Sequence, residues 1–146
     1  MNKNNQPQEL SFYGLSLLSF LKESHPERIS DTAFIKTRAD LAGETYSQSI
    51  KDGLSPNQAE ELANEVLYWG LHFSKHDTLV NILWNEFADI VPQSEAKALA
   101  IRIQPESEDV FSRYSLMDEF AASDKYDSMY TALTGCIDLW LEENEL

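Results

Sequence analysis

Two glutamates and two histidines follow one another at helical spacing between residues 61 and 76. Glu61, Glu65, His72 and His76 are separated by steps of four, seven and four residues. On one continuous helix these steps place all four side chains along the same face. Carboxylates and imidazoles are common ligands of zinc and other transition metals. The spacing therefore makes these four residues candidate metal ligands.

A second interpretation of the same residues needs no metal, and we favour it. The stretch from His72 to His76 lacks the glutamate directly after the first histidine that the zinc-protease motif requires. Glutamates early in a helix and histidines late in it also complement the helix dipole. We therefore predict a solvated helix face, with metal binding as the alternative, and we predict no cofactor.

The sequence contains few residue patterns that indicate catalysis. Adjacent acids such as Glu108 and Asp109 diverge by about 100° on a helix, so they cannot act as a carboxylate pair. The serines lack a nucleophile elbow, and His25, His72 and His76 have no local Ser or Cys partner signature. We predict a protein without catalytic residues. A small helical enzyme assembled from distant positions stays an alternative.

Tryptophans and an acidic C-terminal segment supply candidate recognition residues. Trp69, Trp84 and Trp140 lie on three different predicted helices, where core packing accounts for them. Aromatic anchors also dominate the energetics of interfaces, so Trp69 or Trp140 can alternatively bind a partner. The acids that follow Trp140 are Glu142, Glu143 and Glu145. Because acids at a helix C-terminus oppose its dipole, we consider two roles for them: a solubilising end and a surface for a basic partner.

The charge of the chain excludes several classes of partner. Its 11 Lys and Arg against 25 Asp and Glu give a formal charge of −14, and residues 105–146 hold 11 of the acids and two of the bases. Such a charge repels nucleic-acid phosphates and anionic lipid. We predict direct binding of neither nucleic acid nor membrane.

Cysteine usage and hydropathy indicate the compartment. Cys136 is the only cysteine, which rules out a disulfide within the chain and suits a reducing environment. The polar first seven residues do not resemble a secretory signal. No run approaches the roughly 18 apolar residues of a membrane span. We expect a cytoplasmic protein.

Apolar periodicity predicts the elements that position these residues. Apolar side chains recur every three or four residues, and the alternation typical of strands is missing. The predicted helices span about 10–24, 31–52, 56–76, 78–91, 96–104 and 125–141, with further turns over 106–113 and a link over 115–123. We predict an all-α fold: a polar tail over 1–7, then a single compact multihelical domain of six or seven helices over 8–146.

The clearest helix start combines Ser55, Pro56 and Gln58, which form a capping box with proline at the first helical position. Gly70 falls on the apolar stripe of the same predicted helix. There a missing side chain would let a neighbouring helix approach closely, at a cost of roughly 1 kcal/mol in helix propensity. The other candidate N-caps are Ser30 or Asp31, Asp77 or Thr78, and Asp124.

Six segments together resemble a known family. They are residues 9–15 (ELSFYGL), 24–27 (SHPE), 31–35 (DTAFI), 38–42 (RADLA), 83–89 (LWNEFAD) and 133–142 (LTGCIDLWLE). The chain resembles, over nearly its whole length, a family of short bacterial proteins classed as a domain of unknown function. These proteins occur in gut and oral anaerobes and are often carried with conjugative transposons. The resemblance implies a multihelical fold and carries no catalytic or binding residue onto this sequence.

The leading functional hypothesis is a non-catalytic, acidic protein-interaction module with a partner that is basic. An acidic decoy that imitates DNA, carried on a mobile element, is an alternative from another class, although it requires carboxylates spaced like phosphates. A small helical enzyme is the third. A homodimer is compatible with each, because apolar residues are left over beside the main stripes: Phe12, Tyr68, Trp69 and Leu71.

Overall fold

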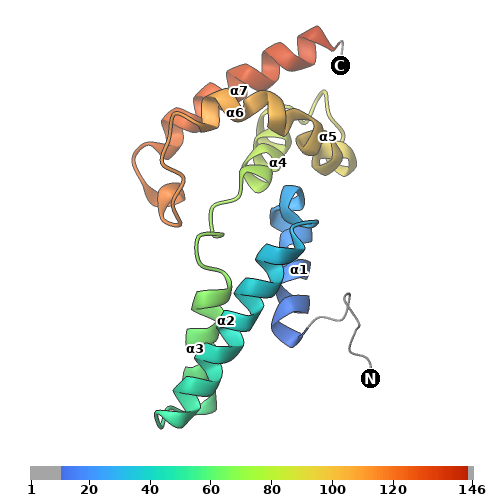
Figure 1. Ribbon diagram of the computed structural model, residues 1–146. Coiled ribbons are helices and arrows are strands. Elements are labelled where there is room, and N and C mark those ends of the chain that lie inside the picture. The colour runs from blue at the N-terminus through green and yellow to red at the C-terminus, as the bar shows by residue number, and fades with distance from the viewer. Residues whose placement is uncertain (1–10, 145–146) are drawn as a thin grey trace, which may run out of the picture. The chain divides into compact units, whose positions relative to one another are not determined.

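Helices account for all regular secondary structure in residues 11–144, the part of the chain that the computed structural model describes (Figure 1). The α-helices are α1 (Phe12–Ser24), α2 (Thr32–Lys51), α3 (Pro56–Leu67), α4 (Lys75–Glu86), α5 (Ala96–Ile103), α6 (Glu108–Phe111) and α7 (Tyr126–Glu143). Short 3-10 turns lie between them. The predicted all-α fold is confirmed. The predicted tail over 1–7 lies outside the described residues.

The helices belong to two compact units. The N-terminal unit holds α1 to α3 and ends at Trp69, and the C-terminal unit begins at Gly70 and holds α4 to α7. A single domain over 8–146 stays a prediction. Within residues 11–144, none of the helices combines the length and the apolar character needed to span a bilayer.

Small side chains line the interface between α2 and α3. Ala39, Ala42 and Ser49 of α2 are buried, as are Ala59 and Ala63 of α3. Residues of this size let two helices pack closely. The turn that joins them uses Gly53 at a φ of +94°, a backbone conformation that glycine adopts without strain. The two helices therefore form a hairpin.

The start of α3 follows the predicted capping box. The Ser55 Oγ accepts a hydrogen bond from the Gln58 backbone N–H at 3.2 Å, and the Gln58 Oε1 accepts one from the Ser55 N–H at 3.0 Å. Pro56 occupies the first helical position, where its missing N–H costs nothing. Local chemistry alone fixes this boundary.

The first helix covers one face of the hairpin. Leu17 and Leu21 of α1 are fully buried. The Tyr13 hydroxyl donates to the Glu60 carboxylate of α3 at 3.0 Å, and burial together with this carboxylate raises the pKa of Tyr13 to about 12. The Phe20 ring meets the Tyr68 ring edge to face, with centroids 5.0 Å apart. These contacts place α1 against the side of α3 that carries Glu60 and Tyr68.

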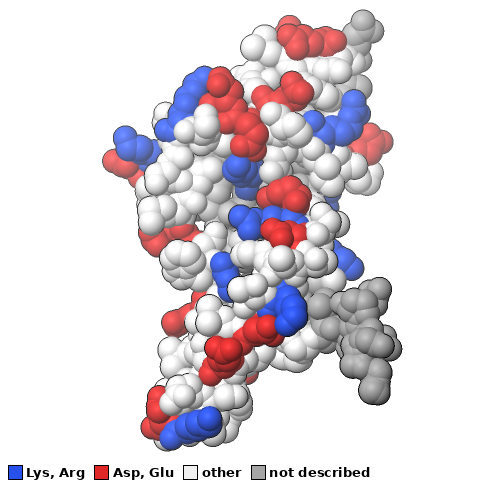
Figure 2. All heavy atoms as spheres, in the orientation of Figure 1, with Lys and Arg blue, Asp and Glu red and all other residues white. Residues whose placement is uncertain are grey.

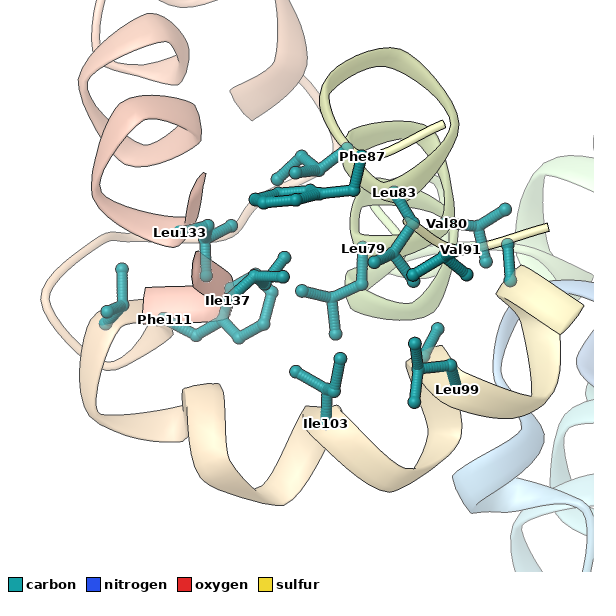
Figure 3. Close-up of a cluster of buried hydrophobic side chains, with 14 of the residues drawn as sticks. Leu79, Val80, Leu83, Phe87, Val91, Leu99, Ile103, Phe111, Leu133 and Ile137 are labelled. Carbon is teal, nitrogen blue, oxygen red and sulfur yellow. The ribbon is translucent and has the colours of Figure 1, made fainter. Parts of the chain in front are cut away.

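The C-terminal unit has a core of large aliphatic and aromatic residues. Figure 3 shows Leu79 and Leu83 of α4 facing Leu133 and Ile137 of α7, with Ile103 of α5 beside them. All five are fully buried. This core joins helices that lie far apart in the sequence.

Several predicted helix boundaries were wrong, including the end of the fourth helix, which lies at Glu86 rather than near residue 91. The third helix ends at Leu67 rather than continuing past Phe73, and Gly70 lies in the following link at a φ of +79°. A left-handed residue cannot continue an α-helix, so Gly70 has no role in helix packing. The fourth helix begins at Lys75, because the Ser74 Oγ accepts from the Asp77 N–H at 2.9 Å; Asp77 and Thr78 lie inside it.

The last helix also starts differently from the prediction. Its N-cap is Lys125, which makes no side-chain capping bond, in place of Asp124. The Ser123 Oγ accepts from the Lys125 N–H at 3.4 Å instead. Leu71, which we counted among the surplus apolar residues, is only 3% exposed and is part of the buried interior.

Replacing Leu79 by alanine should destabilise the C-terminal unit strongly. Leu79 is 0% exposed, so the substitution leaves a cavity and should lower the free energy of unfolding by about 2–5 kcal/mol. Urea unfolding followed by circular dichroism measures the change. Leu139→Ala is the matched control, since Leu139 is 61% exposed. Equal effects of the two substitutions would contradict the described core.

Candidate protein-interaction site

An exposed tryptophan stands just past the end of α3. Trp69 is 71% exposed, more than any other large apolar residue in the described part of the chain. Its backbone N–H donates to the Val66 carbonyl at 3.4 Å, which continues the last turn of the helix. A tryptophan that remains in water leaves a large apolar area available for burial against a partner.

Trp69 lines a shallow groove between α2 and α3, with a volume of about 380 Å³. The lining residues, which define the Trp69 groove, are Arg38, Leu41, Glu65, Val66 and Trp69. Leu41 is 49% exposed there. The groove therefore presents apolar side chains from both helices of the hairpin.

Arg38 fixes the backbone that carries Trp69. Its Nη1 donates to three carbonyls at the end of α3: Val66 at 3.3 Å, Leu67 at 3.2 Å and Trp69 at 2.7 Å. The last carbonyls of a helix have no partner within the helix and carry the negative end of its dipole. Because α3 has no basic residue in its own last turn, Arg38 of α2 supplies that positive charge.

Asp118 fixes the residues that follow Trp69. Its carboxylate accepts the Gly70 N–H at 2.9 Å and the His72 N–H at 3.1 Å, and it lies 3.1 Å from the His72 Nδ1. Burial acts to raise the pKa of Asp118, but the hydrogen bonds from Gly70 and His72 outweigh it and hold the pKa below its usual value. Asp118 thus holds the start of the link within the C-terminal unit.

The four predicted metal ligands do not share one helix. Glu61 and Glu65 are exposed on α3, which ends five residues before His72. His72 lies in the link beside Asp118, and His76 is buried in the first turn of α4. The predicted common face was wrong, because the left-handed Gly70 separates the helices. No group of three or more His, Cys, Asp or Glu within residues 11–144 is placed to hold a metal ion.

The other two tryptophans differ from Trp69 in their surroundings. Trp140 is half-buried against the core of the C-terminal unit, and the Arg102 guanidinium lies 5.3 Å from the centre of its ring. Trp84 is 36% exposed, and its Nε1 donates to the Gln93 carbonyl at 3.3 Å. Core packing describes Trp140 and does not describe Trp69.

The acidic candidates at the C-terminus belong to a different unit of the chain from the groove. Glu142 and Glu143 are exposed at the end of α7, in the C-terminal unit, and Glu145 lies outside the described residues. Over the hairpin, Figure 2 shows acidic and basic side chains alternating with uncharged surface. Trp69 thus belongs to the N-terminal unit, whereas Trp140 and these two acids belong to the C-terminal unit.

Two residues of the groove were missed by sequence reasoning. Leu41 was not singled out as a site residue; it is 49% exposed, whereas its neighbours Ala39 and Ala42 are buried. Arg38 had no assigned role. The signal for it was indirect: α3 ends without a basic residue of its own, so its carbonyls need a donor from elsewhere.

Comparison with known proteins gives two matches. The model of a family described as a domain of unknown function (DUF1896) matches residues 5–146. The crystal structure of protein PG0816 from Porphyromonas gingivalis is similar at a TM-score of 0.88, with 41% sequence identity over 99% of this chain and 98% of that one. No curated protein matches. The predicted resemblance to a family of unknown function is confirmed, and its mobile-element setting stays a prediction.

Removing the Arg38 guanidinium should destabilise the N-terminal unit. Arg38→Ala removes the guanidinium donor from three carbonyls at the end of α3 and should lower the free energy of unfolding by about 2 kcal/mol. Lys36→Ala is the control on the same helix, because exposed Lys36 pairs only with Asp40 and such pairs stabilise little. Urea midpoints measure both. An Arg38→Ala midpoint as high as that of Lys36→Ala would refute the capping role.

The Asp118 clamp should give a pH dependence of stability. Because the folded-state pKa is lowered, its contribution is complete above the ordinary value of 3.8 and is lost as the pH falls through the folded-state pKa. The stability difference between wild type and Asp118→Asn should therefore shrink as the pH falls from about 5 to about 2. Urea midpoints measured across this range provide the comparison. A difference that stays constant would contradict the clamp.

Proposed function

We propose that this chain, which belongs to the family described as a domain of unknown function (DUF1896), is a non-catalytic protein-interaction module. Membership of that family assigns no activity to the chain. The proposal assigns the docking of a protein partner to the Trp69 groove. One observation carries it: Trp69 is 71% exposed while its own carbonyl is held by Arg38 at 2.7 Å. An accessible aromatic side chain on a fixed backbone is what an interface anchor requires.

The fixed backbone supports binding through its effect on entropy. Association costs free energy for every side chain and loop that becomes ordered on binding. Arg38 already holds the backbone carbonyls of Val66, Leu67 and Trp69. A partner that buries the indole therefore gains apolar burial without first ordering this segment. Tryptophan is among the residues most enriched at the centres of interfaces.

The composition of the groove argues for recognition rather than catalysis. Its lining has one carboxylate, Glu65, and one guanidinium, Arg38, whose Nη1 is engaged with three carbonyls. The remaining lining residues, Leu41, Val66 and Trp69, carry no ionisable group. A general base, a nucleophile or a second acid would be needed beside Glu65 for acid–base or covalent chemistry.

The net charge of the chain indicates the kind of partner, and its cysteine content indicates the compartment. A formal charge of −14 favours encounter with a basic partner, since complementary charge raises association rates. The chain has one cysteine, which suits the reducing cytoplasm. We place the interaction in that compartment. The acids at the end of α7 contribute to the overall charge and lie outside the groove.

Affinity capture tests the proposed anchor. The wild-type chain, used as bait at low salt in a nuclease-treated lysate of the encoding organism, should retain a reproducible partner. Trp69→Ala should reduce its recovery about tenfold or more, because truncating an aromatic hot spot costs at least about 2 kcal/mol. Trp84→Ala, which removes a tryptophan 36% exposed in the C-terminal unit, should leave recovery unchanged. Equal recovery with all three baits would contradict the proposal.

A further inference from the structure

We propose that the occupant of the Trp69 groove is one amphipathic helix of a partner protein, with an apolar stripe against the groove and lysine or arginine along its edges. The inference rests on the proposed function, because it names the partner for the same site. Three observations support it: the open face of the hairpin, the helical spacing of the groove residues, and the charge at the groove margin.

The hairpin has a covered face and an open face. Glu60 and Tyr68 mark the side of α3 that α1 covers, through Tyr13 and Phe20. Leu62 is two positions after Glu60, and so lies about 200° around the helix from it. Leu62 is 37% exposed. On this opposite side α3 has apolar residues without a covering helix from α1.

The open face offers a groove that can bind a helix. Leu62, Val66 and Trp69 follow one another at steps of four and three residues along the end of α3, and Leu41 faces them from α2 across the groove. Two packed helices offer a groove into which a third helix fits by its side-chain ridges. With α1 on the other face, a helix seated here completes a four-helix arrangement. No strand edge for β-addition is present in residues 11–144.

A second hollow lies along α2 and shares Leu41 with the Trp69 groove. This hollow, of about 840 Å³, has a mostly polar lining: Leu41, Gly43, Glu44, Thr45, Ser47, Gln48, Ser49 and Lys51. From Arg38 to Gln48 the helix rises about 15 Å, which corresponds to about three turns of a bound helix. The expected occupant is therefore about three turns long, with its apolar contacts at the Trp69 groove.

The acidic residues at the groove margin indicate which side chains the edges of the bound helix should carry. Glu65 lines the groove, Glu61 lies one turn before it, and Glu44 lies one turn after Leu41; all three acids are exposed. The cation that lines the Trp69 groove is Arg38, whose guanidinium binds carbonyls of α3 and lies 4.7 Å from the centre of the Phe34 ring. Lys51 lines the second hollow, so the acidic margin is that of the Trp69 groove, at Glu61 and Glu65. Exposed carboxylates around an apolar strip favour a partner with cations at matching positions, and disfavour an acidic one.

The direct test uses two designed peptides. Both are helical, about 15 residues long, and carry leucines at steps of three and four; one has lysines on its flanks and the other glutamates at the same positions. Fluorescence anisotropy of labelled peptide with the full-length protein measures binding. The lysine peptide should bind at least about tenfold more tightly than the glutamate peptide, and its affinity should fall as salt is added.

Matched variants locate the binding. Trp69→Ala should weaken the lysine peptide about tenfold or more, and Trp84→Ala should not. The double substitution Glu61→Gln and Glu65→Gln should reduce the preference for lysine over glutamate flanks. Glu142→Gln with Glu143→Gln, at the end of α7, removes the same charge elsewhere and should leave that preference intact. Circular dichroism confirms that each variant is folded.

Other outcomes overturn the inference and remain distinct from failure of the proposed function. Equal affinity for the two peptides refutes the basic partner. Absence of binding by either peptide, while a host partner is still captured through Trp69, refutes the helix and leaves the interaction module standing. A wild-type dimer that Trp69→Ala converts to a monomer in light scattering assigns the groove to a second copy of the chain and also overturns the inference.

Discussion

The end of α3 depends on one side chain from another helix. Four carbonyls at a helix C-terminus lack internal partners, and α3 offers no basic residue in its last turn to meet them. Arg38 reaches three carbonyls between Val66 and Trp69 from α2. Its guanidinium is planar and permanently charged, which lysine does not reproduce. This interaction holds α2 to the end of α3 and fixes the backbone from which Trp69 projects.

The sequence predicted those elements whose boundaries follow from local chemistry. The capping box at Ser55 was confirmed, and the helices predicted over 10–24 and 96–104 end at Ser24 and Ile103, each just before a proline turn. The end of α3 was missed because Gly70 was interpreted as a small residue inside a helix, whereas it occupies a left-handed position after one. Helical periodicity alone cannot distinguish these, since the apolar spacing continues through the link to Phe73.

The candidate site was predicted in part. Trp69 was one of two proposed anchors, and its exposure separates it from half-buried Trp140. The role of Arg38 could not be predicted from sequence patterns, because its carbonyl partners lie 28 to 31 residues further along the chain. The prediction that Glu61, Glu65, His72 and His76 share one helix face was wrong for the same reason as the predicted end of α3. The similarity to PG0816 supports the fold, while the functional argument rests on the groove and its margin.

Quenching of single-tryptophan variants tests most directly whether Trp69 is available to a partner. One variant carries Trp84→Phe and Trp140→Phe and keeps Trp69; the other carries Trp69→Phe and Trp84→Phe and keeps Trp140. Acrylamide should quench Trp69 much more strongly, because it is 71% exposed while Trp140 packs against the core beneath Arg102. Quenching of Trp69 that is equal to or weaker than that of Trp140 would contradict an accessible anchor, and with it the proposed docking site.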